Sequence, residues 1–302
     1  SADYQSDIKI SDDMLKQLSE SYRKIRNTAR YMLGNLSDFN PETDKVKYAD
    51  MAEIDRFALY KLNTLVKKVI NWYDTYDFHL MQVAIHQFCV LDMSNFYLDI
   101  IKDRLYTQAP DSVERRSAQT AMHIILDALV RLLSPVLCFT AEEIWQAMPH
   151  NAGDDTYSVL FNDMPKNVEE YNDEKLGEKY ELIRKIRTDV SKALEIARAD
   201  KVIGHSLNAK VELCAEDKLY DFLKKNEKDL VTLFIISDAK VSNGSADGAY
   251  KGEEVEGLSV KVSQADGDKC ERCWMFSTTV GEDSDHPKLC RRCAEVVKKI
   301  KF

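Results

Sequence analysis

Apolar residues recur at steps of three and four along the first half of the chain, which is the period of an amphipathic helix. One apolar stripe runs through residues 14–36, and a second runs through residues 51–76. Two further helices are predicted over residues 78–106 and 118–136, and Pro135 is expected to kink or stop the last one. Helices of this length joined by short loops predict an antiparallel bundle.

Local capping signals place the starts of two of these helices. Ser11, followed by two aspartates, predicts the beginning of the first helix, because its hydroxyl can accept a hydrogen bond from the first turn. Thr140 and Glu143 have the spacing of a capping box, so a short helix is predicted to restart at that point.

The second half of the chain has a different pattern. Residues 149–172 are rich in Asn, Asp, Pro and Gly and form a predicted linker, and a helix over residues 175–202 is expected to close at Gly204. A helical segment over residues 217–230 lies among strands predicted at residues 209–215, 232–241 and 258–262. These elements predict a small α/β module, and a short basic helix ends the chain.

Four cysteines near the end of the chain have the spacing of a zinc site. Cys270-x-x-Cys273 and Cys290-x-x-Cys293 are separated by sixteen residues, and each CxxC turn can deliver two thiolates to one tetrahedral ion. With four protein ligands no position stays open for water, which predicts one structural zinc ion rather than a catalytic one. A redox dithiol or two disulfides are the competing interpretations, but the βαβ pattern that accompanies a thioredoxin-like CxxC is missing.

These patterns together predict a mainly α protein in three parts. Residues 1–150 form an antiparallel helix bundle, residues 151–265 a linker with the small α/β junction module, and residues 266–302 a zinc-binding module built as a four-cysteine knuckle or ribbon. A length of 302 residues is compatible with roughly two domains of ordinary size and a small appendage.

Composition limits the setting in which the chain works. It contains no run of eighteen or more apolar residues, so no membrane-spanning helix is predicted. The first residues lack a basic and apolar leader and an initiator Met, which favours a soluble cytoplasmic chain or a piece of a longer one. Seven cysteines, three of them isolated, fit a reducing compartment better than a disulfide framework.

The net charge of −9 gives no whole-chain signature of nucleic-acid binding, but two segments are locally basic. Six Lys or Arg face three acids between Lys9 and Arg30, and six face one acid between Lys288 and Lys301. Such patches can follow a phosphate backbone, or they can simply solvate a helix face.

Several stretches, in the same order along the chain, resemble the C-terminal part of bacterial isoleucyl-tRNA synthetases. They are residues 22–41 (YRKIRNTARYMLGNLSDFNP), 96–107 (FYLDIIKDRLYT), 115–145 (RRSAQTAMHIILDALVRLLSPVLCFTAEEIW), 205–213 (HSLNAKVEL) and 270–274 (CERCW). The YRKIRNT and FTAEEIW segments are typical of the class I synthetases for aliphatic amino acids, and the pair of zinc knuckles narrows the resemblance to the isoleucine enzyme.

This resemblance implies a bundle of the class I anticodon-binding type. The bundle would grip the anticodon stem-loop of tRNA(Ile), and the zinc-bearing tail would fold back to touch the anticodon region. In the whole enzyme, an isoleucine–tRNA ligase, ATP would bind in a catalytic domain that this chain lacks, as it lacks the editing domain. The resemblance further implies a monomer in the cytoplasm, without a membrane partner.

The catalytic signatures of that family are missing from this sequence. No KMSKS motif is present, and Ile203-Gly204-His205-Ser206 lacks the first His of a HIGH motif and is interpreted as a helix stop. No catalytic residue is therefore assigned, and the chain by itself is predicted to be inactive.

Candidate tRNA contacts lie at both ends of the chain. Trp274, directly after a knuckle cysteine, either packs into the core of the zinc module or stacks on an unpaired base, with core packing preferred because small zinc modules have little else to bury. The basic candidates are residues off the apolar stripe of the first helix and residues of the last helix: Arg23, Lys24, Arg26, Arg30, Arg292, Lys298 and Lys299.

Two other functions remain open from the sequence. Some DNA-repair glycosylases carry a finger of similar cysteine spacing, although this chain shows no N-terminal catalytic segment of that kind. A helical scaffold with a structural zinc ion and no role in nucleic-acid binding would also fit the pattern.

Overall fold

The computed structural model describes residues 2–5, 7–8 and 10–300, so Lys9 and Lys301 of the two basic segments lie outside the described residues. The chain divides into two compact units, one formed by Ser1–Leu105 with Pro110–Gly177 and the other by Tyr106–Ala109 with Glu178–Phe302. The predicted domain division at residues 150 and 265 stays a prediction. No helix in the described part of the chain is both long and apolar enough to cross a bilayer.

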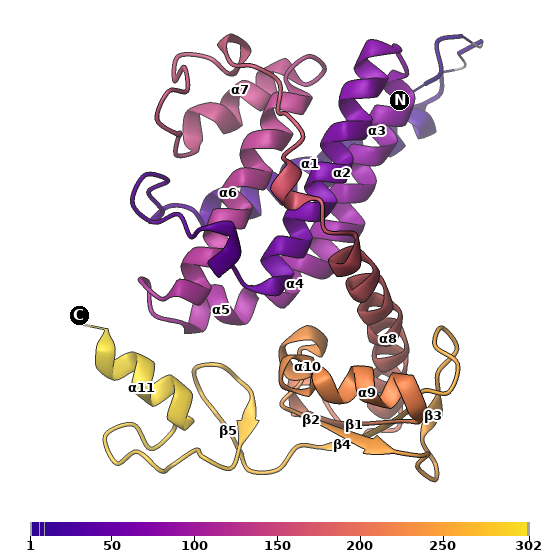
Figure 1. Ribbon diagram of the computed structural model, residues 1–302, viewed down its shortest axis with the longest axis vertical. Coiled ribbons are helices and arrows are strands. Elements are labelled where there is room, and N and C mark those ends of the chain that lie inside the picture. The colour runs from indigo at the N-terminus through magenta and orange to yellow at the C-terminus, as the bar shows by residue number, and fades with distance from the viewer. Residues whose placement is uncertain (1, 6, 9, 301–302) are drawn as a thin grey trace. The chain divides into compact units, whose positions relative to one another are not determined.

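The first unit is a helix bundle, as the sequence predicts (Figure 1). Its main helices are α1 Asp12–Gly34, α2 Glu53–Asp74, α3 Phe78–Gln87, α6 Val113–Leu133 and α7 Cys138–Ala147. Short 3₁₀ turns lie at η1 Tyr48–Asp50, η3 Val159–Phe161 and η4 Glu169–Tyr171. α2 contacts both α3 and α6, and α1 contacts α3, α6 and α7.

The apolar stripe of α1 is buried along only half of its length. The helix begins where predicted, since the Ser11 side chain accepts a hydrogen bond from the N–H of Met14 at 3.3 Å. The later part of the stripe is buried, from Ile25 to Leu36, whereas Leu18 is 41% exposed. The stripe therefore extends beyond the surface that the other helices of this unit cover.

The third predicted helix is not a uniform α-helix. α3 continues as a π-helical segment, η2, over Phe88–Tyr97, and then as α4 Leu98–Ile100 and α5 Lys102–Thr107. The hydroxyl of Thr28 on α1 lies 3.3 Å from the carbonyl oxygen of Cys89 and 3.0 Å from the hydroxyl of Ser94. The wider π turn thus brings polar backbone and side-chain atoms to the face that packs on α1.

The capping-box prediction at Thr140 was wrong. α7 already begins at Cys138, and its N-cap residue Leu137 makes no side-chain cap bond. Thr140 lies inside the helix, where its hydroxyl pairs with the phenol of Tyr22 at 3.0 Å, and the Glu143 carboxylate lies 3.4 Å from the Arg26 guanidinium. Long-range partners on α1 therefore hold the two side chains that a local cap would have used.

A buried ion pair joins the helices of the first unit. The carboxylate of Asp55 on α2 is fully buried and accepts two hydrogen bonds from the Arg104 guanidinium on α5, at 2.6 and 2.9 Å. The Tyr97 hydroxyl donates to the same carboxylate at 2.9 Å, and the Ser117 hydroxyl on α6 donates to it as well. Burial, together with the Asp55 charge, raises the pKa of Tyr97 well above its usual value, so this phenol stays a donor.

The second unit contains the predicted α/β module. α8, Glu174–Ala199, leads to the turn η5 Ser206–Asn208 and to a four-stranded sheet in the order β2-β1-β4-β3 (Figure 1). The strands are β1 Ala209–Ala215, β2 Asp238–Asn243, β3 Tyr250–Lys251 and β4 Ser259–Gln264. β1 is parallel to β2 and antiparallel to β4, and helices α9 Asp217–Lys225 and α10 Glu227–Phe234 form the crossover between β1 and β2.

Two predicted boundaries in this unit are wrong. The strand expected to start at Thr232 begins only at Asp238, because α10 runs on to Phe234 and ends at Ile235 in the left-handed conformation (φ 56°). The residue that closes α8 in a left-handed conformation is Lys201 (φ 59°) rather than Gly204. Backbone conformations of this kind are uncommon for residues other than Gly, so the sequence carries no signal for either turn.

A single carboxylate attaches the loop before β4 to α8. Asp189 is 1% exposed, and its two oxygens accept hydrogen bonds from the backbone N–H groups of Glu253, Glu254 and Val255 at 2.9–3.1 Å. A Cβ at Gly252 would lie 2.7 Å from the same carboxylate. The close approach of backbone and carboxylate therefore requires glycine at this position.

The zinc-knuckle segment follows the sheet. It contains the short strands β5 Asp268–Lys269 and β6 Phe276–Ser277 and the terminal helix α11 Arg291–Lys299. The Ser237 hydroxyl joins it to the α/β module, since Ser237 Oγ accepts the N–H of Phe276 at 2.7 Å and donates to the carbonyl oxygen of Leu207 at 2.5 Å.

Substituting Asp55→Asn should lower the free energy of unfolding by about 3–5 kcal/mol, because the Arg104 charge would remain buried without its counter-ion. Chemical denaturation followed by circular dichroism would measure the difference. Asp74→Asn, at the exposed end of the same helix, is the matched control and should change the value by less than about 0.5 kcal/mol. Equal stability of the two variants would show that the buried pair does not hold the bundle together.

Candidate nucleic-acid interface and metal centre

The four predicted cysteine ligands come together at one point in the second unit. Their sulfur atoms all lie within 4.8 Å of one another, and the Sγ atoms of Cys273 and Cys290 are 3.9 Å apart. A tetrahedron of thiolates with bonds of about 2.3 Å has sulfur–sulfur edges of roughly 3.8 Å. Cys270, Cys290 and Cys293 are buried, and Cys273 is partly exposed. The cluster therefore has the size and the donor atoms for one tetrahedral metal ion.

The surroundings of the thiols also suit a thiolate cluster. The backbone N–H of Cys290 donates to the sulfur of Cys270 at 3.3 Å. A hydrogen bond from Cys293 and the nearby Arg292 guanidinium lower the pKa of the Cys273 thiol to about 4, while the same bond and burial raise that of Cys293. Within this pair, the surroundings therefore favour the negative charge on Cys273.

Arg292, one of the candidate RNA contacts, lies beside the cysteine cluster, and its RNA contact stays a prediction. The side chain is only partly exposed on α11, with Nη2 3.7 Å from the sulfur of Met275, and its charge stabilises the Cys273 thiolate. Its location beside the cysteine cluster indicates a role in balancing negative charge there.

The expectation that Trp274 packs into the core was wrong. The side chain is 61% exposed, and the residue has a left-handed backbone (φ 64°) that lets its N–H donate to the carbonyl oxygen of Cys270 at 2.9 Å. The tight turn after the knuckle therefore turns the indole out of the small core, which the cysteines fill with partly buried Val280 and Leu289.

Sequence reasoning missed Lys269 as a neighbour of this indole. Lys269 belongs to β5, and its ammonium nitrogen lies 5.6 Å from the centroid of the Trp274 ring. An exposed ring beside a cation can offer stacking and charge to a nucleic-acid strand at the same place. The short β5–β6 pairing that brings the two side chains together has no sequence signal beyond the knuckle itself.

The basic face of α1 is partly neutralised. The Arg23 guanidinium pairs with Glu20 one turn earlier, and the Arg26 guanidinium pairs with Glu143 on α7. Lys24 and Arg30 are exposed, and in the described part of the chain neither has an ion pair. Of the four predicted contacts on α1, Arg23 and Arg26 are therefore paired with carboxylates, whereas Lys24 and Arg30 are not, as far as the described residues extend.

On α11 too, one candidate lysine is paired with a carboxylate and the other, within the described chain, is not. The Lys298 ammonium pairs with the Asp283 carboxylate and lies 3.9 Å from that of Asp285. Lys299 is exposed and has no ion pair among the residues that the structure describes.

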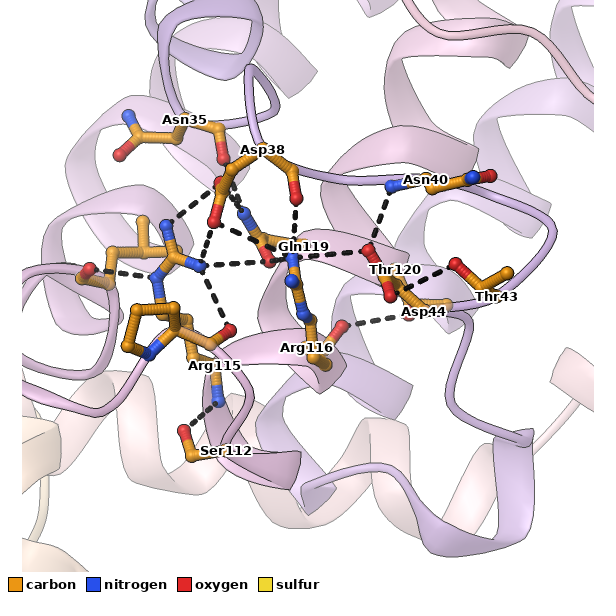
Figure 2. Close-up of polar contacts among 12 residues, drawn as sticks. Asn35, Asp38, Asn40, Thr43, Asp44, Ser112, Arg115, Arg116, Gln119 and Thr120 are labelled. Carbon is orange, nitrogen blue, oxygen red and sulfur yellow. Dashed lines mark hydrogen bonds and ion pairs between the residues drawn. The ribbon is translucent and has the colours of Figure 1, made fainter. Parts of the chain in front are cut away.

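A polar network between α6 and the loop after α1 was not predicted (Figure 2). Arg115 at the start of α6 makes two bonds to the Asp38 carboxylate, at 2.6 and 3.0 Å, and Arg116 donates to the Asp38 carbonyl oxygen at 2.9 Å. The Gln119 amide is buried and donates to the same carboxylate at 2.8 Å. These arginines are therefore occupied in positioning the loop, although their charges alone would have suggested phosphate contacts.

Two protein-family models match this chain, one over part of the helix bundle and the α/β module and one over the cysteine cluster. The family model described as the anticodon-binding domain of tRNA ligase matches residues 55–213. The model described as the zinc finger found in FPG and IleRS matches residues 267–296, which include all four clustered cysteines.

Curated relatives match nearly the whole chain. The isoleucine–tRNA ligase of Desulforamulus reducens is 52% identical over 301 residues, which are 99% of this chain and 32% of the relative. The isoleucine–tRNA ligases of Caldanaerobacter subterraneus and Bacillus cytotoxicus are 48% and 46% identical over 302 and 299 residues. The chain spans about a third of the length of these relatives, at 32% of each.

The Asp38 network predicts a specific pH dependence. Arg115 lowers the pKa of Asp38 below its ordinary value, so the ion pair stabilises the folded chain at neutral pH and this contribution is lost as pH falls through the lowered pKa. Asp38→Asn should cost up to about 1 kcal/mol from pH 5 to 8, a small value because the Asp38 side chain is 42% exposed to screening solvent. The stability difference should begin to shrink below about pH 4 and vanish only below the lowered pKa of Asp38.

Urea unfolding of wild type and variant at a series of pH values would test this expectation. The control is Asp50→Asn, which removes an exposed carboxylate that has no ion pair in the described part of the chain. A stability difference for Asp38→Asn that stays constant as the pH is lowered from 5 into the acid range would contradict the ion-pair explanation.

Proposed function

This chain belongs to the family of anticodon-binding domains of tRNA ligases, and we propose that it is the tRNA-recognition portion of an isoleucine–tRNA ligase. The observation that carries the proposal is the joint match, in one chain, of the anticodon-binding domain over residues 55–213 and of the zinc finger over residues 267–296. Relatives that cover 99% of the chain are isoleucine–tRNA ligases, which supports the choice of amino acid.

The partner in this proposal is tRNA(Ile), held at its anticodon stem-loop. Unpaired loop bases can be splayed out and recognised at their edges, whereas the deep major groove of an RNA duplex is closed to side chains. The bundle would grip the stem through phosphate contacts, which position the RNA without reading it. The zinc module would supply a ring on which an unpaired base can stack.

Cys270, Cys273, Cys290 and Cys293 are the proposed ligands of one structural zinc ion. The closeness of their sulfur atoms, the burial of three of the four side chains and the neighbouring Arg292 charge support this assignment. When bound, zinc would supply a cross-link between the two knuckles and no catalytic chemistry, because all four positions are filled by protein.

The proposed RNA contacts are the exposed groups that have no acidic partner among the residues described, rather than every basic residue of the two basic segments. Trp274 with Lys269 is the proposed stacking site, and Lys24, Arg30 and Lys299 are exposed cations suited to phosphate contacts. Arg23, Arg26 and Lys298 would have to leave an acidic partner before meeting a phosphate, so their contribution should be smaller.

The remaining activity of the enzyme is assigned to the other two-thirds of the longer relatives. ATP and isoleucine would bind there, since neither the HIGH nor the KMSKS motif occurs in this sequence. We further propose that the protein acts as a monomer in the cytoplasm. A DNA-glycosylase role is not favoured, because the finger is shared by both protein classes but the anticodon-binding match is not.

Purified chain should contain one zinc ion, and Cys290→Ser should lose it, because removing one thiolate opens the closed coordination shell. Elemental analysis would measure zinc content, and hydrogen exchange would report folding of the tail, since the free energy of metal binding is part of its folding free energy. The first unit should melt as in wild type.

Cys138→Ser is the control, since Cys138 is exposed on α7 and outside the cluster. It should retain the full equivalent of zinc. A metal-replete, folded preparation without zinc would contradict the proposed ligand set.

Trp274→Ala should weaken binding of tRNA(Ile) by roughly 5- to 150-fold, the range that corresponds to about 1–3 kcal/mol for the loss of one base–aromatic stack. Trp274→Phe should recover part of the affinity because it keeps a ring. Fluorescence anisotropy at several salt concentrations would give both the affinity and its salt dependence.

An anticodon-substituted tRNA serves as the matched RNA control. Wild type should discriminate against it, and Trp274→Ala should discriminate less, while both proteins retain salt-dependent binding to phosphates. Full affinity in Trp274→Ala with an intact fold would remove the indole from the interface, and no salt-dependent RNA binding by wild type would favour a scaffold role instead.

A further inference from the structure

A hollow of about 380 Å³ lies in the second unit where α8 ends and the chain turns toward the sheet. It is lined by Arg198 near the end of α8 and Lys201 just after it, and by Asn208 of η5 and Gln264 at the end of β4. Ile203, which is buried, and Gly204 also belong to its lining. Neither the zinc cluster nor the proposed stacking site contains any of these residues.

The polar side chains around this hollow lack protein partners. Arg198, Lys201 and Gln264 are exposed and Asn208 is partly exposed, and among the described residues none of the four side chains has a hydrogen bond or an ion pair. No carboxylate lines the hollow. Two positive charges and two amide groups thus meet without the acidic side chain that neutralises most other arginines of this chain.

The hollow differs from the paired sites of the chain because two cations line one concavity whose lining contains no carboxylate. The chain has a net charge of −9, and the cations at Arg23, Arg26 and Lys298 all pair with carboxylates. Asp200 lies in the same turn as the hollow but not in its lining. An uncompensated pair of cations in a concave site attracts a compact anion more strongly than the same charges on a convex surface.

The backbone holds the hollow in a defined shape. Lys201 has a left-handed conformation, and the N–H of Val202 donates to the carbonyl oxygen of Ala197 at 2.9 Å, which closes the end of α8. The carbonyl oxygen of Asn208 accepts the N–H of Ala265 at 2.8 Å, which fixes the opposite wall to the end of β4. The four side chains therefore start from fixed positions, so little backbone ordering would accompany ligand binding.

We infer that this hollow binds a phosphate group of the RNA backbone. Guanidinium, ammonium and amide groups are all donors that match phosphate oxygens, and Arg is especially suited to phosphate through its fixed fork of N–H groups. No aromatic side chain lines the hollow, so it offers no surface on which a base could stack. The inference rests on the proposed function for the source of the phosphate, and it adds a contact distant in sequence from both basic segments.

The double variant Arg198→Gln/Lys201→Gln tests this inference with the full chain. It should reduce the slope of log K against log salt for tRNA binding by about 1–2 units, since each phosphate contact contributes somewhat less than one unit. The loss should be similar for tRNA with the natural and the substituted anticodon, because a phosphate contact does not read sequence. Lys67→Gln/Lys68→Gln is the matched control, since it removes two exposed charges from α2 and should leave the slope unchanged.

A titration with inorganic phosphate distinguishes the source of the ligand. Amide chemical shifts of Lys201 and Gly204 should move in wild type and in the α2 control, and should stay still in the double variant. Phosphate-dependent shifts without any change in the tRNA salt slope would mean a site for free phosphate, which overturns the inference and leaves the proposed function intact. Absence of tRNA binding by wild type would instead overturn the proposed function, and an unchanged slope with no phosphate shifts would dismiss the hollow as a binding site.

Discussion

The carboxylate of Asp55 is the constraint on which the packing of the first unit depends. It is fully buried on α2, and its acceptor capacity is filled by Arg104, Tyr97 and Ser117, which come from the helices on either side. A charge in this position is stable only while all of its donors are in place. The ion pair therefore selects one relative arrangement of helices, which apolar stripes alone would leave free to rotate and slide.

In the second unit, a cluster of four sulfur atoms takes the place that the buried ion pair has in the first. Its zinc segment has a core of three buried cysteines with a few partly buried apolar side chains, which is too little apolar surface for a stable fold. Four converging sulfur atoms replace the missing core and leave the indole of Trp274 exposed. In both units a small group of polar atoms therefore fixes the local geometry of the fold.

Much of this fold could be predicted from periodicity and spacing. The helix stripes, the strand at residues 209–215 and the cysteine cluster depend on local patterns, which a sequence displays directly. The errors had two causes. Thr140 meets the distant Tyr22 rather than capping its own helix, and Trp274 is turned outward by a local left-handed backbone that its sequence does not signal. Arg26 pairs with Glu143 only because the fold places α7 beside α1, whereas the pair between Arg23 and Glu20 has the local i,i+3 spacing that a sequence displays.

The number of residues in the π-helical segment Phe88–Tyr97 sets the rotation of every helical residue that follows it in the bundle. Deleting one residue there would rotate everything that follows by about 100°, the angle between successive residues of an α-helix. Arg104 would then face away from Asp55, although every side chain of the buried cluster would still be present in the sequence. Among homologous chains, substitutions in this segment should therefore be far more common than insertions or deletions. The number of residues between α3 and Arg104 should stay the same even where the residues themselves differ.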